Sequence, residues 1–199
     1  MFEQKGWWFK RRLKHCGRGA IIYAKAELIK PQVIAIGAHT QIDDFVWILG
    51  GRGVTIGQYV HIASFVSVAG GGELVVEDYA GISAGCRLVT GTDDFLGAGL
   101  TGPTLPSEFR SVKRSSIILR RHALLGTGVI VHPDVEIGEG AVVGSGSLVL
   151  HDVPPWTVNV GSPCRVIKER PREVIVAFRE ELERKYRSVD GTLNRGEDQ

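Results

Sequence analysis

Between Leu119 and Val149 an aliphatic residue recurs at every sixth position, a period that fits neither a helix nor a single strand. An α-helix repeats its apolar face about every 3.6 residues, and a half-buried strand repeats at every second residue. A period of six therefore indicates a larger unit that returns to the same wall, with short buried strands joined by corners. The residues at this period are Leu119, Leu125, Val131, Ile137, Val143 and Val149.

The same ladder runs through the earlier part of the chain with longer coils. The step is six within each group of three apolar residues and eight between groups, which makes these coils 20 residues long. The extra residues fall in 50–53 and 70–73, where glycine tolerates the positive φ of a corner. We therefore predict a mainly β fold, a parallel β-helix over residues 22–170. The earlier ladder consists of Ile36, Ile42, Ile48, Ile56, Ile62, Val68, Val76, Ile82 and Leu88.

Four other segments flank or interrupt the predicted β-helix. Residues 1–21 form a basic, aromatic N-terminal segment, and residues 89–117 break the ladder as an extruded loop. Residues 171–187 carry apolar side chains at steps of four and predict a helix that covers the last coil. Residues 188–199 form a polar tail. Four apolar residues of the loop predict that it packs: Phe95, Leu100, Leu105 and Phe109.

Composition narrows the functional classes. The net charge of +2 argues against nucleic acid as a partner, and 43% hydrophobic residues are enough for a real core. The cysteines, Cys16, Cys86 and Cys164, are odd in number and widely spaced, which favours a reducing compartment. No apolar run approaches the ~20 residues of a membrane helix, so we expect a soluble, cytoplasmic protein.

The N-terminal segment allows two interpretations. Trp7, Trp8 and Phe9 stand beside several lysines and arginines. These aromatic residues either cap the open first edge of the solenoid or lie on a membrane surface, where tryptophan and basic residues suit the headgroup region.

The run at 161–168, Gly-Ser-Pro-Cys-Arg-Val-Ile-Lys, is more specific than the repeat itself. Together with the ladder and the extruded loop, it resembles the hexapeptide-repeat acyltransferases, in particular the galactoside and maltose acetyltransferase group. The resemblance covers roughly residues 22–170. It implies a left-handed β-helix and a homotrimer with acetyl-CoA, a co-substrate, in the groove between subunits. It also implies a sugar or nucleotide-sugar acceptor near the loop, and no metal.

The resemblance also implies coenzyme-binding positions. Thr127 and Ser145 match pantetheine-contacting sites, although corners prefer small residues in any case. Arg165 and Lys168 suit phosphate groups, and the alternative is that they form a solvated edge. His151 stands where the family commonly has lysine. The full set of implied coenzyme residues is Gly126, Thr127, Ser145, Leu150, His151, Arg165 and Lys168.

The catalytic base is where this sequence departs from the family. The position of the family's loop histidine is occupied by Asp93, and the loop contains no histidine. An aspartate with a pKa near ~4 is a weak base unless burial or Asp94 raises that pKa. One expectation is that His61 or His122 reaches the site from the same or a neighbouring subunit, with Asp93 and Asp94 binding the acceptor or orienting a histidine. Alternatively, the acceptor is an amino sugar, which needs little base.

These residues predict an acetyl-CoA-dependent acetyltransferase that acts on a sugar hydroxyl or amine in bacterial surface polysaccharide synthesis. Ser64 or a backbone amide would stabilise the oxyanion, and Phe95 would contact the acceptor. A non-catalytic scaffold or membrane-associated binding protein is one alternative. A metal enzyme like the β-helical carbonic anhydrases is another. Their zinc needs three histidines with two of them about five residues apart, a spacing not found among the histidines at 39, 61, 122, 132 and 151.

Overall fold

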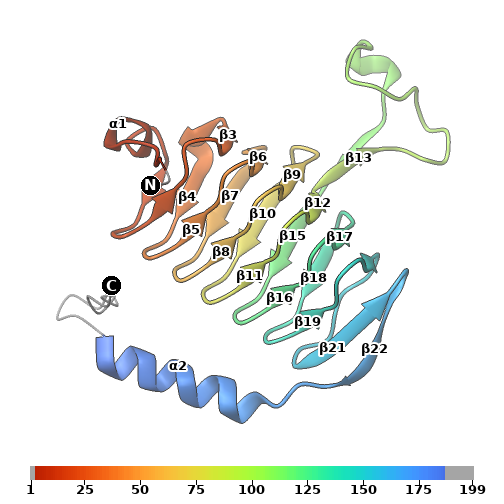
Figure 1. Cartoon of the computed structure of the whole chain (residues 1–199). Coiled ribbons are helices and arrows are strands. Elements are labelled where there is room, and N and C mark those ends of the chain that lie inside the picture. Colours follow the sequence, from red (N-terminus) through yellow and green to blue (C-terminus); the bar gives the residue numbers. More distant parts are fainter. Residues whose placement is uncertain (1–2, 187–199) are drawn as a thin grey trace.

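The computed structural model describes residues 3–186, which form a β-solenoid with a projecting loop and a C-terminal helix (Figure 1). The chain passes through three parallel sheets in turn, so successive strands belong to different sheets. The predicted mainly β solenoid is confirmed. The expected polar tail, 188–199, lies outside the described residues.

The three sheets are named here in the order in which the chain enters them. The first sheet contains β1 (His15–Cys16), β4 (Ile34–Ile36), β7 (Gly53–Ile56), β10 (Glu73–Val76), β15 (Ser116–Leu119) and β18 (Val135–Ile137). The second contains β2 (Ile21–Ile22), β5 (Gln41–Ile42), β8 (His61–Ile62), β11 (Gly81–Ile82), β16 (Leu124–Leu125), β19 (Val142–Val143), β21 (Thr157–Gly161) and β22 (Cys164–Glu169). The third contains β3 (Glu27–Ile29), β6 (Trp47–Leu49), β9 (Ser67–Ala69), β12 (Arg87–Val89), β17 (Ile130–Val131) and β20 (Leu148–Val149).

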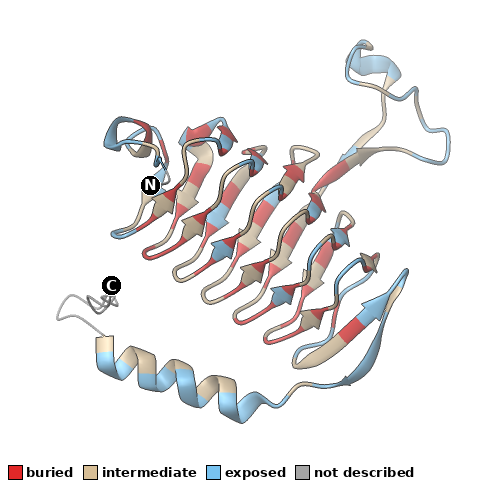
Figure 2. Cartoon of the chain, in the orientation of Figure 1, coloured by how far each residue is buried: buried red, intermediate tan, exposed pale blue. Residues whose placement is uncertain are grey.

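Strand register explains the two coil lengths. In the first sheet Ile34 pairs with Val54, twenty residues on, whereas Ile117 pairs with Val135, eighteen residues on. The longer coils carry their extra residues between the third and first sheets, where Gly51 and Gly70 adopt positive φ. The six residues of the later ladder, Leu119 to Val149, are all 0% exposed and stack inside the three sheets (Figure 2). The periodicity therefore marks the core, as predicted.

Three corners join the sheets. The aromatic corner lies between the first and second sheets (37–40, 57–60, 77–80, 120–123, 138–141 and 154–156). The open corner lies between the second and third sheets (43–46, 63–66, 83–86, 126–129 and 144–147). The loop corner, between the third and first sheets, carries the extruded loop. In a three-sided prism each sheet lies opposite one corner, so the second sheet lies opposite the loop corner.

The aromatic corner holds a column of stacked rings. Ring centroids are 4.9 Å apart for His39 and Tyr59, 5.6 Å for Tyr59 and Tyr79, and 5.2 Å for Tyr79 and His122. Trp156 continues the column at 6.3 Å from His122. All five residues have a positive φ, which a side chain with a Cβ rarely adopts. Ring stacking between coils stabilises this repeated left-handed position.

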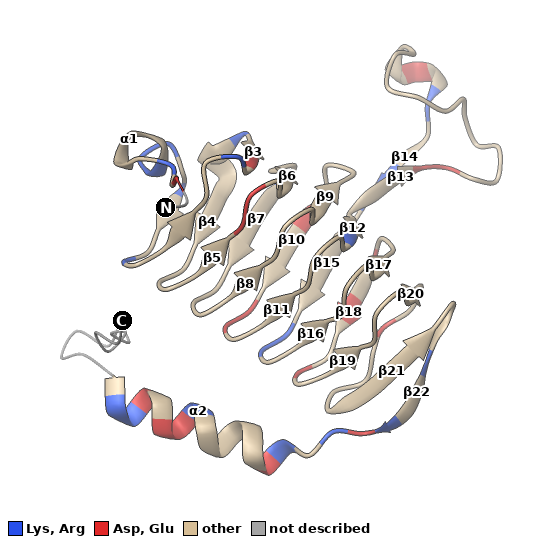
Figure 3. Ribbon diagram, in the orientation of Figure 1, with Lys and Arg blue, Asp and Glu red and all other residues tan. Residues whose placement is uncertain are grey.

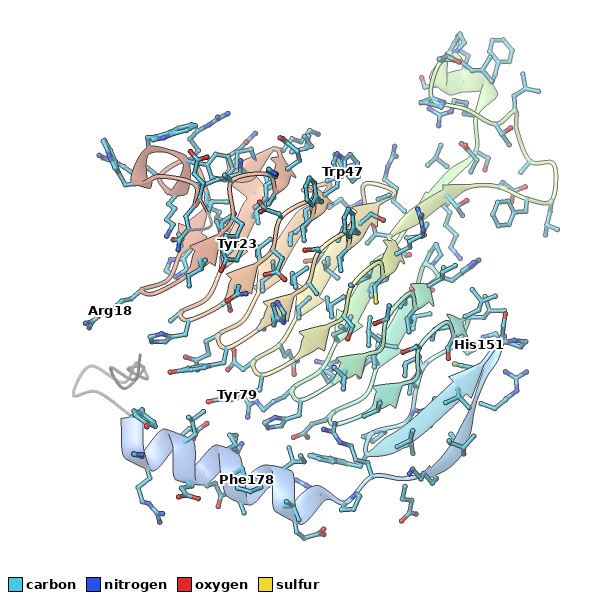
Figure 4. All side chains as sticks on the ribbon, viewed as in Figure 1. Arg18, Tyr23, Trp47, Tyr79, His151 and Phe178 are labelled. Atoms are coloured by element: carbon cyan, nitrogen blue, oxygen red, sulfur yellow. The ribbon has the colours of Figure 1, made fainter. Side chains whose placement is uncertain are left out.

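Helix α2 (Arg172–Tyr186) runs back along the aromatic corner instead of covering only the last coil, so that expectation was wrong. Near its end the Tyr79 hydroxyl donates a hydrogen bond to Glu183 at 3.1 Å, and Figure 4 shows Tyr79 on the side of the solenoid that faces the helix. Before the helix, Arg170 donates to the carbonyls of His122 and Gly140. These contacts hold α2 along several coils.

The extruded loop projects away from the solenoid on a two-stranded stalk, β13 (Gly91–Asp93) and β14 (Val112–Arg114), with a 3-10 turn η2 (Ser107–Phe109). Its apolar side chains do not pack against the solenoid as expected: Phe95 is 77% exposed, and Leu100 and Phe109 are each 58% exposed. The loop extends beyond the reach of its own coils, so its apolar residues remain without cover from the described chain.

The N-terminal segment comprises α1 (Trp7–Lys10) and β1, followed by η1 (Pro31–Val33) after the first coil. Because β1 pairs with β4, the first sheet begins inside the segment 1–21 rather than at residue 22. No helix among residues 3–186 is long and apolar enough to cross a membrane.

Candidate active site

The open corner gathers several of the predicted site residues in one column. Backbone hydrogen bonds link its rungs: Gly85 N–H donates to the Ser64 carbonyl, and Gly146 N–H donates to the Thr127 carbonyl. Thr127 and Ser145 are exposed and occupy equivalent places in successive coils. Ser64, Thr127 and Ser145, which the sequence placed in separate roles, therefore face solvent along one edge.

In the later coils, glycine replaces the aromatic residue at the positive-φ position of the open corner and leaves the backbone there uncovered. At the left-handed position of each rung, Phe45 and Phe65 are followed by Gly85, Gly128 and Gly146, with φ between +64° and +72°. The two phenyl rings stack at 5.1 Å. A Cβ at any of the three glycines would meet no atom within 4 Å. The corner thus changes from a ring-covered surface to bare backbone beside Thr127 and Ser145.

His61 lies on the second sheet, next to the open corner. Its Nε2 is 3.0 Å from Asp43 Oδ2, and the Gln41 amide donates to the other oxygen of Asp43 at 2.8 Å. The His61 side chain is 54% exposed, so it faces solvent while Asp43 fixes its ring. A neighbouring cavity of about 230 Å³ is lined by Tyr23, Gln41, Asp43, Asp44 and Ser64. This cavity offers several hydrogen-bonding groups to a polar ligand.

A second cavity, of about 180 Å³, lies at the C-terminal end of the solenoid. Leu150, His151 and Arg165 line it, and Figure 4 shows His151 at that end. Arg165 pairs with Val160 between β21 and β22, and Val160 lies against Gly144 at the open corner. Lys168 is exposed on the edge strand β22. The structure therefore brings three predicted coenzyme residues to one cavity and leaves Lys168 on the neighbouring edge.

The acidic loop residues have defined partners. Asp93 Oδ1 accepts a hydrogen bond from Arg110 at 3.0 Å, and its Oδ2 accepts one from Gly102 N–H at 3.1 Å. Asp94 Oδ2 accepts from the N–H groups of Leu96 and Ala98. The Ala98 amide and then the Leu96 amide lower the pKa of Asp94, so this carboxyl group shapes the loop as an anion.

His122 lies elsewhere, in the buried column of the aromatic corner. It is 7% exposed, and no hydrogen-bond partner within residues 3–186 faces its Nε2. Burial, and then the charge of Arg179, lower the pKa of His122. The structure does not bring His122 together with His61, which lies on the next sheet, or with the loop.

Asp93 and His61 of one chain are also apart. Asp93 belongs to the loop corner, and His61 belongs to the sheet opposite that corner, with the buried core between them. Asp43 and Arg110, which hold His61 and Asp93, were not among the residues predicted from the sequence. The aromatic corner was not predicted either, although the twenty-residue steps from His39 to Tyr59 and Tyr79 are present in the sequence.

Comparisons with known proteins identify this arrangement. Residues 116–151 match the family model described as bacterial transferase hexapeptide (six repeats). Over 163 residues the chain is 35% identical to the dTDP-4-amino-4,6-dideoxy-D-glucose acyltransferase of Escherichia coli, which covers 81% of this chain and 85% of that protein. The chain belongs to the hexapeptide-repeat acyltransferases. The resemblance inferred from the repeat and its terminal run is confirmed.

Solved structures extend the match to nearly the whole acyltransferase chain. AntD, an N-acyltransferase from Bacillus cereus solved with dTDP and 3-hydroxybutyryl-CoA, is 36% identical, with a TM-score of 0.86 over 93% of this chain and 99% of that chain. Galactoside O-acetyltransferase of E. coli K12 is 43% identical over 53 residues, only 27% of this chain and 26% of that enzyme. The protein is therefore an acyltransferase that uses a coenzyme A thioester as co-substrate.

The remaining reactive side chains of the described residues are metal-ligand types and the three cysteines. Among residues 3–186 no group of three or more histidine, cysteine or acidic residues is arranged to hold a metal ion. Cys86 is buried, and burial raises the pKa of its thiol; Cys16 and Cys164 are partly buried with the same effect. Raised thiol pKa values fit the interpretation of these cysteines as packing residues.

Proposed function

We propose that this acyltransferase transfers an acyl group from coenzyme A to the amino group of a dTDP-linked 4-amino-4,6-dideoxy sugar. The observation that carries the proposal is the match over most of the chain to two enzymes whose names state dTDP-aminosugar or N-acyl chemistry. The product would supply a bacterial surface polysaccharide. An amine acceptor also accounts for a loop that has aspartate where an O-acetyltransferase has a histidine base.

A pair of residues supports this assignment. Variants of AntD were solved at one serine and at one aspartate ten positions later, in complexes with dTDP, its aminosugar and coenzyme A. In this chain Ser83 and Asp93 have the same spacing, Ser83 at the open corner and Asp93 in the loop. We assign the oxyanion or acceptor hydrogen bond to Ser83 and the amine hydrogen bond to the Asp93 carboxylate.

The reaction balances without a dedicated protein base. The neutral amine nitrogen attacks the thioester carbonyl carbon, the C–N bond forms and the C–S bond breaks. The proton lost by nitrogen passes to the departing sulfur, which gives an amide and free coenzyme A. Asp93 accepts a hydrogen bond from the amine and turns its lone pair toward the thioester. His61, oriented by Asp43, and Ser64 bind the sugar, while Phe95 of the loop covers it.

The coenzyme lies along the open corner in this proposal. Its phosphates contact Arg165 and Lys168 near the second cavity, with Leu150 and His151 beside them. The pantetheine arm passes the backbone of Gly126 with Thr127 and Ser145, and the thioester reaches Ser83. Ser83, Gly126, Thr127 and Ser145 belong to rungs of the open corner, whereas Arg165 and Lys168 lie on β22 beside its C-terminal end.

A cyclic homotrimer would complete the site. Asp93 and Ser83 of one chain lie on opposite sides of the solenoid, and the loop exposes Phe95, Leu100 and Phe109. In a cyclic assembly the loop of one copy can pack against the second sheet of its neighbour, which would cover these apolar residues.

The substrate is tested by measuring thiol release and product mass with three acceptors: the dTDP-linked 4-amino sugar, the free amino sugar and a galactoside. Acetyl-CoA and 3-hydroxybutyryl-CoA are each used as the donor. We expect turnover only with the dTDP-linked 4-amino sugar. Preference for the galactoside hydroxyl would contradict the proposal.

The shared site is tested by subunit complementation. Ser83→Ala and Asp93→Asn are each expected to lower kcat by about 10²-fold. Randomly mixed trimers of the two variants should recover roughly a quarter of wild-type activity, because one site in four then has both residues intact. If both residues came from one chain, mixing would restore nothing.

A further inference from the structure

The N-terminal end of the solenoid carries a basic, aromatic surface that the acyltransfer site does not use. Residues 1–20 contain six basic side chains, Lys5, Lys10, Arg11, Arg12, Lys14 and Arg18, and one acidic side chain, Glu3. Figure 3 shows basic positions around α1, at the opposite end of the solenoid from β22. A cluster of this sign creates a local positive potential on a chain whose net charge is only +2.

The aromatic residues of α1 differ in burial: Phe9 is buried, whereas Trp7 and Trp8 are exposed. Phe9 and Leu13 are 7% and 8% exposed and pack with the first coil, so they cap the solenoid. Trp7 and Trp8 belong to the same short helix but are 70% and 58% exposed. The cap therefore needs only Phe9 and Leu13, and the two indoles face outward.

Cationic side chains lie beside the exposed Trp7 ring and the buried Phe9 ring. The Arg11 guanidinium lies 5.6 Å from the centre of the Trp7 ring, and the Arg12 guanidinium lies 6.0 Å from that of Phe9. Lys5 is 4.7 Å from the Phe9 ring. Both arginines are exposed, so their charges remain available to an external anion. Exposed indoles on the same short segment as exposed guanidinium groups suit the boundary between lipid headgroups and acyl chains.

We propose that Trp7, Trp8, Arg11 and Arg12 form a surface that binds anionic lipid bilayers. Two indoles are too small a patch for a stable protein interface, which buries about 800 Å² per partner. Insertion of the indoles into an interface and attraction of the arginines to anionic headgroups need no such area. A cyclic trimer would present three copies of this surface at one end and increase its avidity.

The test is cosedimentation of the full-length protein with vesicles of phosphatidylglycerol and phosphatidylcholine, compared with vesicles of phosphatidylcholine alone. We expect binding to the anionic vesicles at low salt and weaker binding at high salt, because screening reduces headgroup attraction. Trp7→Ala/Trp8→Ala should lower the partition coefficient at least ~10-fold. Arg11→Gln/Arg12→Gln should lower binding to anionic vesicles selectively.

A control variant removes an exposed aromatic side chain and an arginine outside this surface. Phe178, 67% exposed, and Arg184 both lie on α2 and not on α1, so Phe178→Ala/Arg184→Gln should bind vesicles as the wild type does. Thermal unfolding of each variant checks that it is folded. Absence of wild-type binding to anionic vesicles at low salt would overturn the proposal, as would equal binding by the double tryptophan variant. A change in oligomeric mass without lipid binding would also overturn it and assign the surface to contact between copies.

Discussion

The aromatic corner and the open corner are built on the same backbone but have opposite surfaces. In each, one residue per coil adopts a positive φ, as at Tyr79 and at Gly85. The aromatic corner carries a ring at this position in nearly every coil, and Trp156 fills the place left vacant by Gly140. The open corner carries rings only as far as Phe65 and then glycine. The side chain at the left-handed position therefore decides whether an edge is closed by packing or left accessible to a ligand.

The largest expected effect comes from adding one Cβ to each corner. At Gly140 it would lie 2.4 Å from the Trp156 ring, whereas at Gly146 it would meet nothing within 4 Å. We expect Gly140→Ala to lower the free energy of unfolding by about 3 kcal/mol or more, from backbone strain plus displaced packing. Gly146→Ala should cost only about 1 kcal/mol. Urea unfolding measures both, and equal losses would remove the distinction between the corners.

Filling the open corner should affect binding more than stability. Phe65 adopts φ 65° and Gly128 adopts φ 71°, so the backbone at Gly128 suits a phenylalanine. We expect Gly128→Phe to raise the Kd of acyl-CoA by at least ~10-fold, or about 1.4 kcal/mol, by covering the proposed pantetheine path. Calorimetric titration with coenzyme A measures the change.

The control for this variant adds the same ring outside the open corner. Gly53, on β7, also has nothing within 4 Å of an added Cβ. Gly53→Phe should leave coenzyme affinity unchanged. Unaltered affinity in Gly128→Phe would place the coenzyme away from this edge.

The smallest effect concerns the pH dependence of the closed corner. Burial lowers the pKa of His122 in the folded protein below the ordinary value of 6.5. Between the folded-state pKa and 6.5, the unfolded chain binds more protons at His122 than the folded chain does. The stability that neutral His122 contributes is therefore fully present above pH 6.5 and is lost as the pH falls through the folded-state pKa. His122→Phe should keep the stack and remove this part of the acid sensitivity.

Urea unfolding at several pH values tests the prediction. The exposed His151→Gln variant serves as the control and should retain the wild-type slope of stability against pH. An unchanged slope in His122→Phe would show that this histidine does not contribute to it.

Much of the architecture could be predicted from the sequence because each coil of a solenoid repeats the same spacing of buried residues. Each ladder residue, such as Ile62 or Val131, meets another aliphatic residue one coil away, so its position in the period fixes its burial. The glycine-rich segments 50–53 and 70–73 marked the longer coils correctly. The terminal run at 161–168 indicated the family because its pattern is specific.

The site was less predictable because its parts are joined by contacts between coils. Asp43 reaches His61 only because β5 pairs with β8, and the sequence does not show that pairing directly. The loop was expected to pack because it contains Phe95 and Leu100, but sequence alone could not show that its stalk extends beyond its own coils. In the same way, the period of α2 predicted a helix but not the direction in which it runs.

By itself, the sequence determined the repeat, the buried core and the acyltransferase family, because all three depend on residue types at fixed spacing. Only the tertiary structure decided that His122 belongs to a packed column, that Ser64, Thr127 and Ser145 share one edge, and that Asp93 lies opposite His61. The physical reason is that stacking coils turns a spacing of about twenty residues into van der Waals contact. The face on which each chemical group lies then depends on which sheet or corner its rung occupies.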